Sequence, residues 1–203
     1  LYLNFENADW TFNKNKVKEN NLSSIASLIS NEVFKLTPII HNELVVRDRL
    51  SSMSMNGATI LLNRVFNNSN LKNLGMEGNP SEFGIYLSLI KSNNLHIKKG
   101  DEFVISIENT KNKSIKTIYD EFLKLIKGSK EAVNVSDIYA HFVKQPYGIK
   151  IGLLPILIGI FFKATEASCA FYNKDEQGRE SLITEFDQKV AERMYHMPET
   201  LKI

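Results

Sequence analysis

The segment from Ile151 to Phe162 constrains the fold of this chain more than any other. It contains twelve residues without a charge and is bounded by Lys150 and Lys163. A transmembrane helix needs about twenty apolar residues, so this segment is too short to cross a membrane. Proline is tolerated in the first turn of a helix, so Pro155 indicates a helix that begins close to it. We expect a helix buried in a protein core; the alternative is a surface that contacts a membrane or a partner.

The rest of the composition is that of a folded and nearly neutral protein. The chain has 203 residues, of which 43% are hydrophobic, and this is enough to bury a sizeable core. Lys and Arg number 25 against 23 Asp and Glu, which leaves a net charge of +2. A charge this small does not indicate a nucleic-acid coat protein or a membrane-surface protein. We therefore expect weak binding to nucleic acid and none to membranes.

Cysteine usage and the N-terminal residues bear on the compartment. Cys169 is the single cysteine of the chain, which excludes an intramolecular disulfide and a multi-cysteine zinc site. The residues after Leu1 are polar and show no signal-peptide pattern. We expect a cytoplasmic protein, and we expect this chain to be part of a longer one.

The first half of the chain has a helical period. The first twenty residues are read as an irregular segment whose aromatic side chains dock on the body. In residues 21–95, apolar residues recur at three- and four-residue steps. Asn79, Pro80 and Glu82 form the pattern of a capped helix start. The expected helices cover about 21–37, 42–48 and 52–67, and a fourth begins at Pro80; the docking aromatics are Tyr2, Phe5, Trp10 and Phe12.

The order of predicted elements in residues 96–203 is that of a winged helix. A hairpin over about 96–107 is followed by a helix after Ser114, a short strand, a helix after Ser136, a turn and the apolar helix. Two strands at about 168–172 and 179–183, a helix after Thr184 and an edge strand at 200–203 complete the chain. We predict a mainly α fold with small β hairpins, of the α+β class: a helical bundle followed by a degenerate winged helix. The expected divisions are 1–20, 21–95 and 96–203.

The nature of the third helix of this winged helix bears on function. A DNA-reading winged helix presents polar and basic side chains of that helix to the major groove, and the apolar helix here has almost none. We therefore expect the winged helix to contact protein rather than to read a sequence.

Two groups of basic residues are candidates for contact with phosphate. Arg47, Arg49 and Arg64 are three of the five arginines, and a guanidinium group matches phosphate oxygens in a bidentate manner. The alternative is surface pairing with Glu43 and Asp48. Lys174 and Arg179 flank a predicted turn that could contact a nucleic-acid backbone, although the acids of the same turn offset their charge.

No motif for catalysis, metal or cofactor binding is present. His41, His96, His141 and His196 are scattered and form no HExxH pattern, and the chain has no GxSxG elbow, no P-loop and no GxGxxG. We predict no catalytic residue, no metal and no cofactor. An enzyme remains open only as a third class, through a site assembled from residues distant in sequence.

Three segments carry a resemblance to a known family. They are PIIHNELVVRDRLSS from Pro38, GNPSEFGIY from Gly78 and QPYGIKIGLLPILIG from Gln145. Residues 38–200 resemble the region that follows the P-loop core in large bacterial phage-defence ATPases, the BREX ATPase and its relatives. The resemblance implies a helical and winged-helix region attached to a nucleotide switch. It also implies that the chain is a fragment without Walker motifs, and that Arg47 or Arg49 could reach a nucleotide held by a neighbour.

These observations lead to one expected function and one alternative. We expect a non-catalytic scaffold that contacts another protein chain or an ATPase core within a larger bacterial defence or DNA-transaction assembly. The alternative is a nucleic-acid-binding winged-helix module that uses the arginines and the turn.

Overall fold

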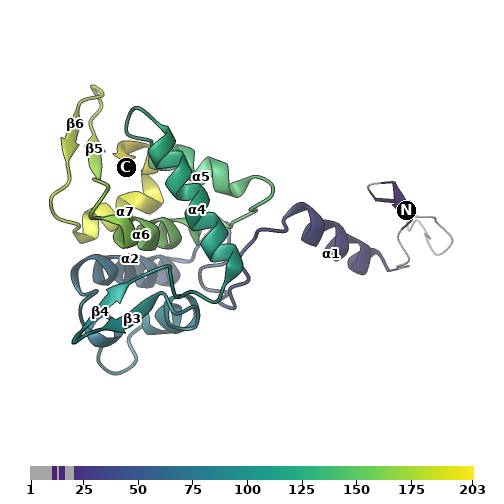
Figure 1. The fold of residues 1–203 in the computed structure, drawn as a ribbon, viewed down its shortest axis with the longest axis horizontal. Helices are drawn as coiled ribbons and strands as arrows, with labels where there is room; N and C mark the ends of the chain where they lie inside the picture. The colour runs from purple at the N-terminus through teal and green to yellow at the C-terminus, as the bar shows by residue number, and fades with distance from the viewer. Residues whose placement is uncertain (1–10, 13, 17–20) are drawn as a thin grey trace.

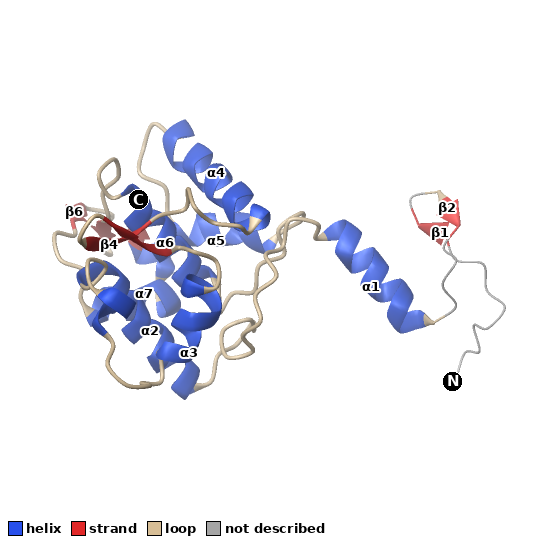
Figure 2. Cartoon of the chain, turned by 60° about the horizontal axis from the view of Figure 1, so that its bottom comes forward, coloured by secondary structure: helices blue, strands red, loops and turns tan. Residues whose placement is uncertain are grey.

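The computed structural model describes residues 11–12, 14–16 and 21–203. This part of the chain is mainly helical with small antiparallel sheets, which confirms the predicted α+β class (Figures 1 and 2). The longer helices are α1 (Leu22–Val33), α2 (Ser52–Asn67), α4 (Lys113–Gly128), α5 (Val135–Val143), α6 (Leu154–Thr165) and α7 (Gln188–His196).

The apolar helix α6 lies at the centre of the body, as its sequence predicts. Every side chain from Leu154 to Phe162 is buried, and Pro155 stands in the first turn. α2 packs directly against α6. A Cβ atom on Gly159 would lie 2.4 Å from Cδ2 of Leu62, so a larger residue would force the Leu62 side chain to move.

Helices α4, α5 and α7 share the core of α6. The Phe161 ring of α6 contacts the rings of Tyr119 and Phe122 on α4, with centroids 5.4 and 5.8 Å apart. α7 packs on α2, and the hydroxyl of Tyr139 on α5 donates to the Met194 carbonyl of α7 at 3.1 Å. One continuous core therefore includes residues from both predicted subdomains. The boundary near residue 95 stays a prediction.

The strands form small antiparallel sheets at the edges of the body. The hairpin β3 (His96–Lys99) and β4 (Glu102–Ile105) pairs His96 with Ile105. A second sheet has the order β6-β5-β7, built from Glu180–Leu182, Tyr172–Lys174 and Leu201–Lys202. Val133 and Ile203 exchange backbone hydrogen bonds of 2.9 and 3.0 Å, which places the predicted strand between α4 and α5 beside β7. The two strands predicted at about 168–172 and 179–183 are present as β5 and β6, with β5 shifted a few residues towards the C-terminus. The short strand predicted between α4 and α5 forms only an isolated bridge, between Asn134 and Lys202.

The helix predicted over 42–48 is wrong. The segment forms turns, because the Asn42 side-chain oxygen accepts a hydrogen bond from the Leu44 backbone N–H at 2.8 Å. The carbonyl of Arg47 accepts the Gly152 N–H at 2.9 Å, so a contact distant in sequence holds the end of this segment against the start of α6.

The helix predicted to begin at Pro80 starts later. α3 covers Phe83–Ile85 and continues as a π-helical segment, Tyr86–Lys91. Glu82 does not reach back to cap the helix; its side chain turns inward and accepts a 2.8 Å hydrogen bond from Arg64 Nε. Three other caps also differ from the predicted Ser114, Ser136 and Thr184: the N-cap positions are Asn112, Asn134 and Asp187.

Helix α1 projects away from the body (Figures 1 and 2). The segment after it is anchored on the turn at 145–148: the Leu36 N–H donates to the Pro146 carbonyl at 3.1 Å, and the Thr37 hydroxyl donates to the Tyr147 carbonyl. The short hairpin of β1 (Thr11–Phe12) and β2 (Asn15–Lys16) lies beyond α1, so Phe12 does not dock on the body. The other aromatics predicted to dock, Tyr2, Phe5 and Trp10, lie outside the described residues.

Candidate functional site

The structure separates Arg64 from the other two candidate arginines. Arg64 lies twelve residues after the first residue of α2, which corresponds to about 18 Å along the helix. Its guanidinium binds Glu82, whose side chain is only 4% exposed. This arginine neutralises a buried carboxylate and links α2 to the start of α3.

Arg47 and Arg49 precede α2 and have different surroundings. The Arg47 guanidinium lies 3.6 Å from Glu43, which is the surface pairing considered from the sequence. Asp48 pairs with Lys150 Nζ at 2.7 Å and with neither arginine. Within the described part of the chain, the side chain of Arg49 has no hydrogen bond and no ion pair, whereas each of the other four arginines has one.

Hydrogen bonds to Asp175 stabilise the turn at 174–179. Asp175 accepts the Arg179 side-chain Nε–H at 2.7 Å and the Arg179 and Gln177 backbone N–H groups at 2.8 and 2.9 Å. The hydrogen bond from the Arg179 side chain is the largest of the contacts that lower the pKa of Asp175. Arg179 is therefore engaged within the turn, and Lys174 lies half-buried in β5.

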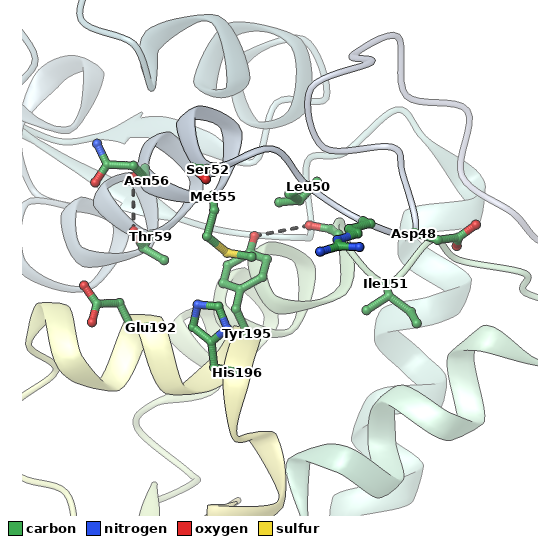
Figure 3. A pocket seen from close by; sticks show the side chains of 12 residues that line it. Asp48, Leu50, Ser52, Met55, Asn56, Thr59, Ile151, Glu192, Tyr195 and His196 are labelled. Carbon is green, nitrogen blue, oxygen red and sulfur yellow. Dashed lines mark hydrogen bonds between the residues drawn. The ribbon is translucent and has the colours of Figure 1, made fainter.

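A cavity of about 580 Å³ lies between the start of α2 and the end of α7 (Figure 3). The segment 48–50 and Ile151 form one side, and Asn56, Thr59 and Glu192 form the other. Tyr195 and His196 of α7 lie between these sides. The Tyr195 hydroxyl donates to the Gly152 carbonyl at 3.2 Å, and burial raises the Tyr195 pKa far above its ordinary value.

This cavity brings together one residue that the sequence singled out and several that it did not. Arg49 lines it, while Arg47, Arg64, Lys174 and Arg179 do not. The spacing of Glu192 and His196 on α7 places them on one helical face, but no sequence signal shows that α7 packs beside α2. The cavity is thus assembled from segments that are far apart in sequence.

A second surface is formed by the projecting helix α1. Leu22 and Leu28 are 51% and 43% exposed, Ile29 and Val33 are half-buried, and Ile25 is buried. Glu32 is the single charged residue of this helix. Its surface is therefore apolar on one side and neutral and polar, mostly serine, on the other.

The described residues show neither a metal-binding cluster nor a membrane-spanning helix. These residues contain no group of three or more His, Cys, Asp or Glu that could hold a metal ion. None of the helices described is long and apolar enough to span a membrane. Cys169 is partly exposed and has a free thiol.

Comparison of the sequence with protein-family models and curated proteins, and of the structure with solved structures, found no match.

Proposed function

We propose that this chain is a non-catalytic protein-interaction module of a larger bacterial assembly, and that α1 is its docking element. The observation that carries the proposal is the position of α1, which projects from the body with Leu22 and Leu28 exposed (Figure 1). The family resemblance over residues 38–200 favours an ATPase core as the partner.

The physical chemistry of α1 supports docking into a groove of a partner. Helices shorter than about 12–15 residues are marginally stable in water, and amphipathic packing supplies most of their stability in proteins. α1 has twelve residues. An amphipathic helix commonly binds by placing its apolar face into a hydrophobic groove. Because α1 has one charge in twelve residues, the groove that fits it is apolar and largely uncharged.

The anchoring of the segment after α1 gives the docking element a defined position. Phe34 packs so closely on the turn at 145–148 that a Cβ atom on Gly148 would lie 2.5 Å from the Phe34 ring. Together with the hydrogen bonds of Leu36 and Thr37, this contact fixes the C-terminal end of α1 to the body. A partner bound to α1 would therefore be held close to α5 and the start of α6.

Site-specific cross-linking tests this proposal. A photoreactive residue placed at Leu28 is expected to form a covalent adduct with one protein of the native assembly. The matched control carries the same group at Ser27, which is exposed on the serine side of α1. Equal labelling from the two positions, or labelling of neither in the native host, would contradict docking through the apolar face.

One observation favours the nucleic-acid alternative, through residues other than those predicted. Lys113, Lys116, Lys124 and Lys127 are all exposed and share one face of α4, interrupted by Asp120. A row of lysines can follow a phosphate backbone, and each neutralised phosphate contributes about 0.9 to the slope of log K against log salt on duplex DNA.

Duplex binding separates this alternative from the docking proposal. We expect the wild-type chain to bind only weakly, with a Kd of about 10⁻⁴ to 10⁻⁶ M at physiological salt. Changing the four α4 lysines to glutamine should weaken duplex binding no more than a control variant that removes the same charge elsewhere. In the control, the exposed Lys98, Lys99, Lys144 and Lys189 are changed to glutamine. Sub-micromolar binding that only the α4 variant loses would establish the alternative.

A further inference from the structure

The cavity between α2 and α7 has the size and the lining of a small-molecule site. Its volume of about 580 Å³ falls within the range of about 300–1,000 Å³ that is typical of ligand pockets. Leu50, Met55 and Ile151 supply apolar walls, and polar side chains stand at the two sides. Two of these polar groups, Arg49 and Glu192, carry opposite charges and lack an ion-pair partner among the described residues.

The first side offers groups that bind an anion. Arg49 presents its guanidinium donors without an internal acceptor. Ser52, the first residue of α2, lines the same cavity, and the N-terminus of a helix favours negative charge. Ser51 caps this helix through the Ser54 N–H, which leaves the N–H groups of the earlier residues of the turn without an intrahelical partner.

The opposite side offers groups that bind a cation or a donor. The Glu192 carboxylate has one contact among the described residues, a hydrogen bond of 3.5 Å from Gln188 Nε2. The Asn56 side chain lies on the same side, as Figure 3 shows. The Thr59 hydroxyl is already engaged, because it donates to the Asn56 carbonyl and accepts from Gln188.

The charges of the cavity select the class of ligand. Asp48 is neutralised by Lys150 at 2.7 Å, which leaves one positive charge, on Arg49, and one negative charge, on Glu192. A phosphate dianion would be repelled by Glu192, and a simple cation would be repelled by Arg49. We propose that this cavity binds a zwitterion, a free amino acid or a short peptide, with its carboxylate at Arg49 and its ammonium group at Glu192.

This inference is independent of α1 and of the protein partner, so it can be tested with the chain alone. Glycine, diglycine and triglycine probe the separation of the two charges without side-chain contacts. Followed by amide NMR shifts, one length is expected to bind saturably and to shift Asn56, Gly152 and His196. N-acetylation or C-terminal amidation of that peptide should weaken binding at least tenfold, because each modification removes one charge.

Matched variants assign the two contacts. Arg49→Gln and Glu192→Gln should each weaken binding about tenfold or more, while Glu185→Gln and Lys189→Gln, which change exposed residues outside the cavity lining, should leave it unchanged. The absence of saturable binding by all three probes would overturn the proposal. So would equal binding of N-acetylglycine or of adenosine monophosphate, which would show a site for anions alone.

Discussion

Gly152 determines how closely the segment before α6 can approach the segment before α2. Its N–H donates to the Arg47 carbonyl at 2.9 Å, and a Cβ atom at this position would lie 2.7 Å from that oxygen and 2.8 Å from the Val45 carbonyl. These obstacles are backbone atoms, which cannot rotate away as a side chain can. Gly57 in α2 differs, because a Cβ atom there would make ordinary contacts of 3.6 Å or more.

The two glycines therefore respond differently to alanine. Gly152→Ala should lower the free energy of unfolding by about 1–3 kcal/mol, the usual cost of an overpacked site. Gly57→Ala should be neutral or stabilising by up to about 1 kcal/mol, because alanine is the better helix former. Urea unfolding of both variants measures this difference, and an equal loss of stability in both would contradict the geometry.

His96 links stability to pH. Its Nε2 lies 2.9 Å from the Ser69 carbonyl and must donate there, so its Nδ1 accepts from the Tyr86 hydroxyl at 3.1 Å. Burial lowers the pKa of His96 and outweighs the backbone hydrogen bond that raises it. In the unfolded chain this histidine has its ordinary pKa of about 6.5. Below that pH the unfolded chain therefore binds a proton at this histidine more readily than the folded chain does.

Stability should consequently decrease as the pH is lowered from about 7 towards 5, where the unfolded state binds more protons than the folded state. His96→Gln should reduce this dependence, whereas His41→Gln, at an exposed position, should preserve it. Thermal unfolding across this pH range is the measurement. An unchanged pH dependence in the His96 variant would show that another group is responsible.

At the scale of elements, the hydropathy pattern predicted correctly the elements that have a clearly apolar, buried side. α2 and α6 and the hairpin of β3 and β4 lie where the pattern placed them. Helix starts were harder, because several polar residues near each start could act as the cap. Asn112 caps α4 two residues before the predicted Ser114, and its Oδ1 accepts the Ile115 N–H at 3.2 Å. The segment 42–48 forms turns instead of the predicted helix, and its Arg47 carbonyl is held by the distant Gly152 N–H, a contact that no local pattern shows.

The core position of α6 predicts the effect of placing a charge in it. Leu154 is fully buried, and an unpaired charge at such a position costs several kcal/mol against a total stability of about 5–15 kcal/mol. Leu154→Asp should therefore unfold the body. Leu182→Asp, the same change at a residue 56% exposed on β6, should be tolerated. Circular dichroism distinguishes the two, and a folded Leu154 variant would contradict a buried α6.

At the scale of the molecule, contacts between distant segments determine what the sequence could not show. Arg49 was a candidate from composition alone, but Glu192 opposite it became visible only when α7 was placed beside α2. Arg64 was grouped with Arg49 by sequence distance, and the fold assigned it to the buried Glu82. The projection of α1 could not be foreseen, because its apolar period is that of a core helix.

The most direct measurement is the affinity between this chain and the protein cross-linked through Leu28. Truncating an anchor residue of an interface costs more than about 1 kcal/mol, so replacing Leu22 and Leu28 by lysine should weaken binding at least about 30-fold. The matched variant, Ser23→Lys with Ser27→Lys, adds the same charge to the serine side of α1 and should bind as the wild type does. Equal affinities of the two variants, with both folded, would contradict docking through α1.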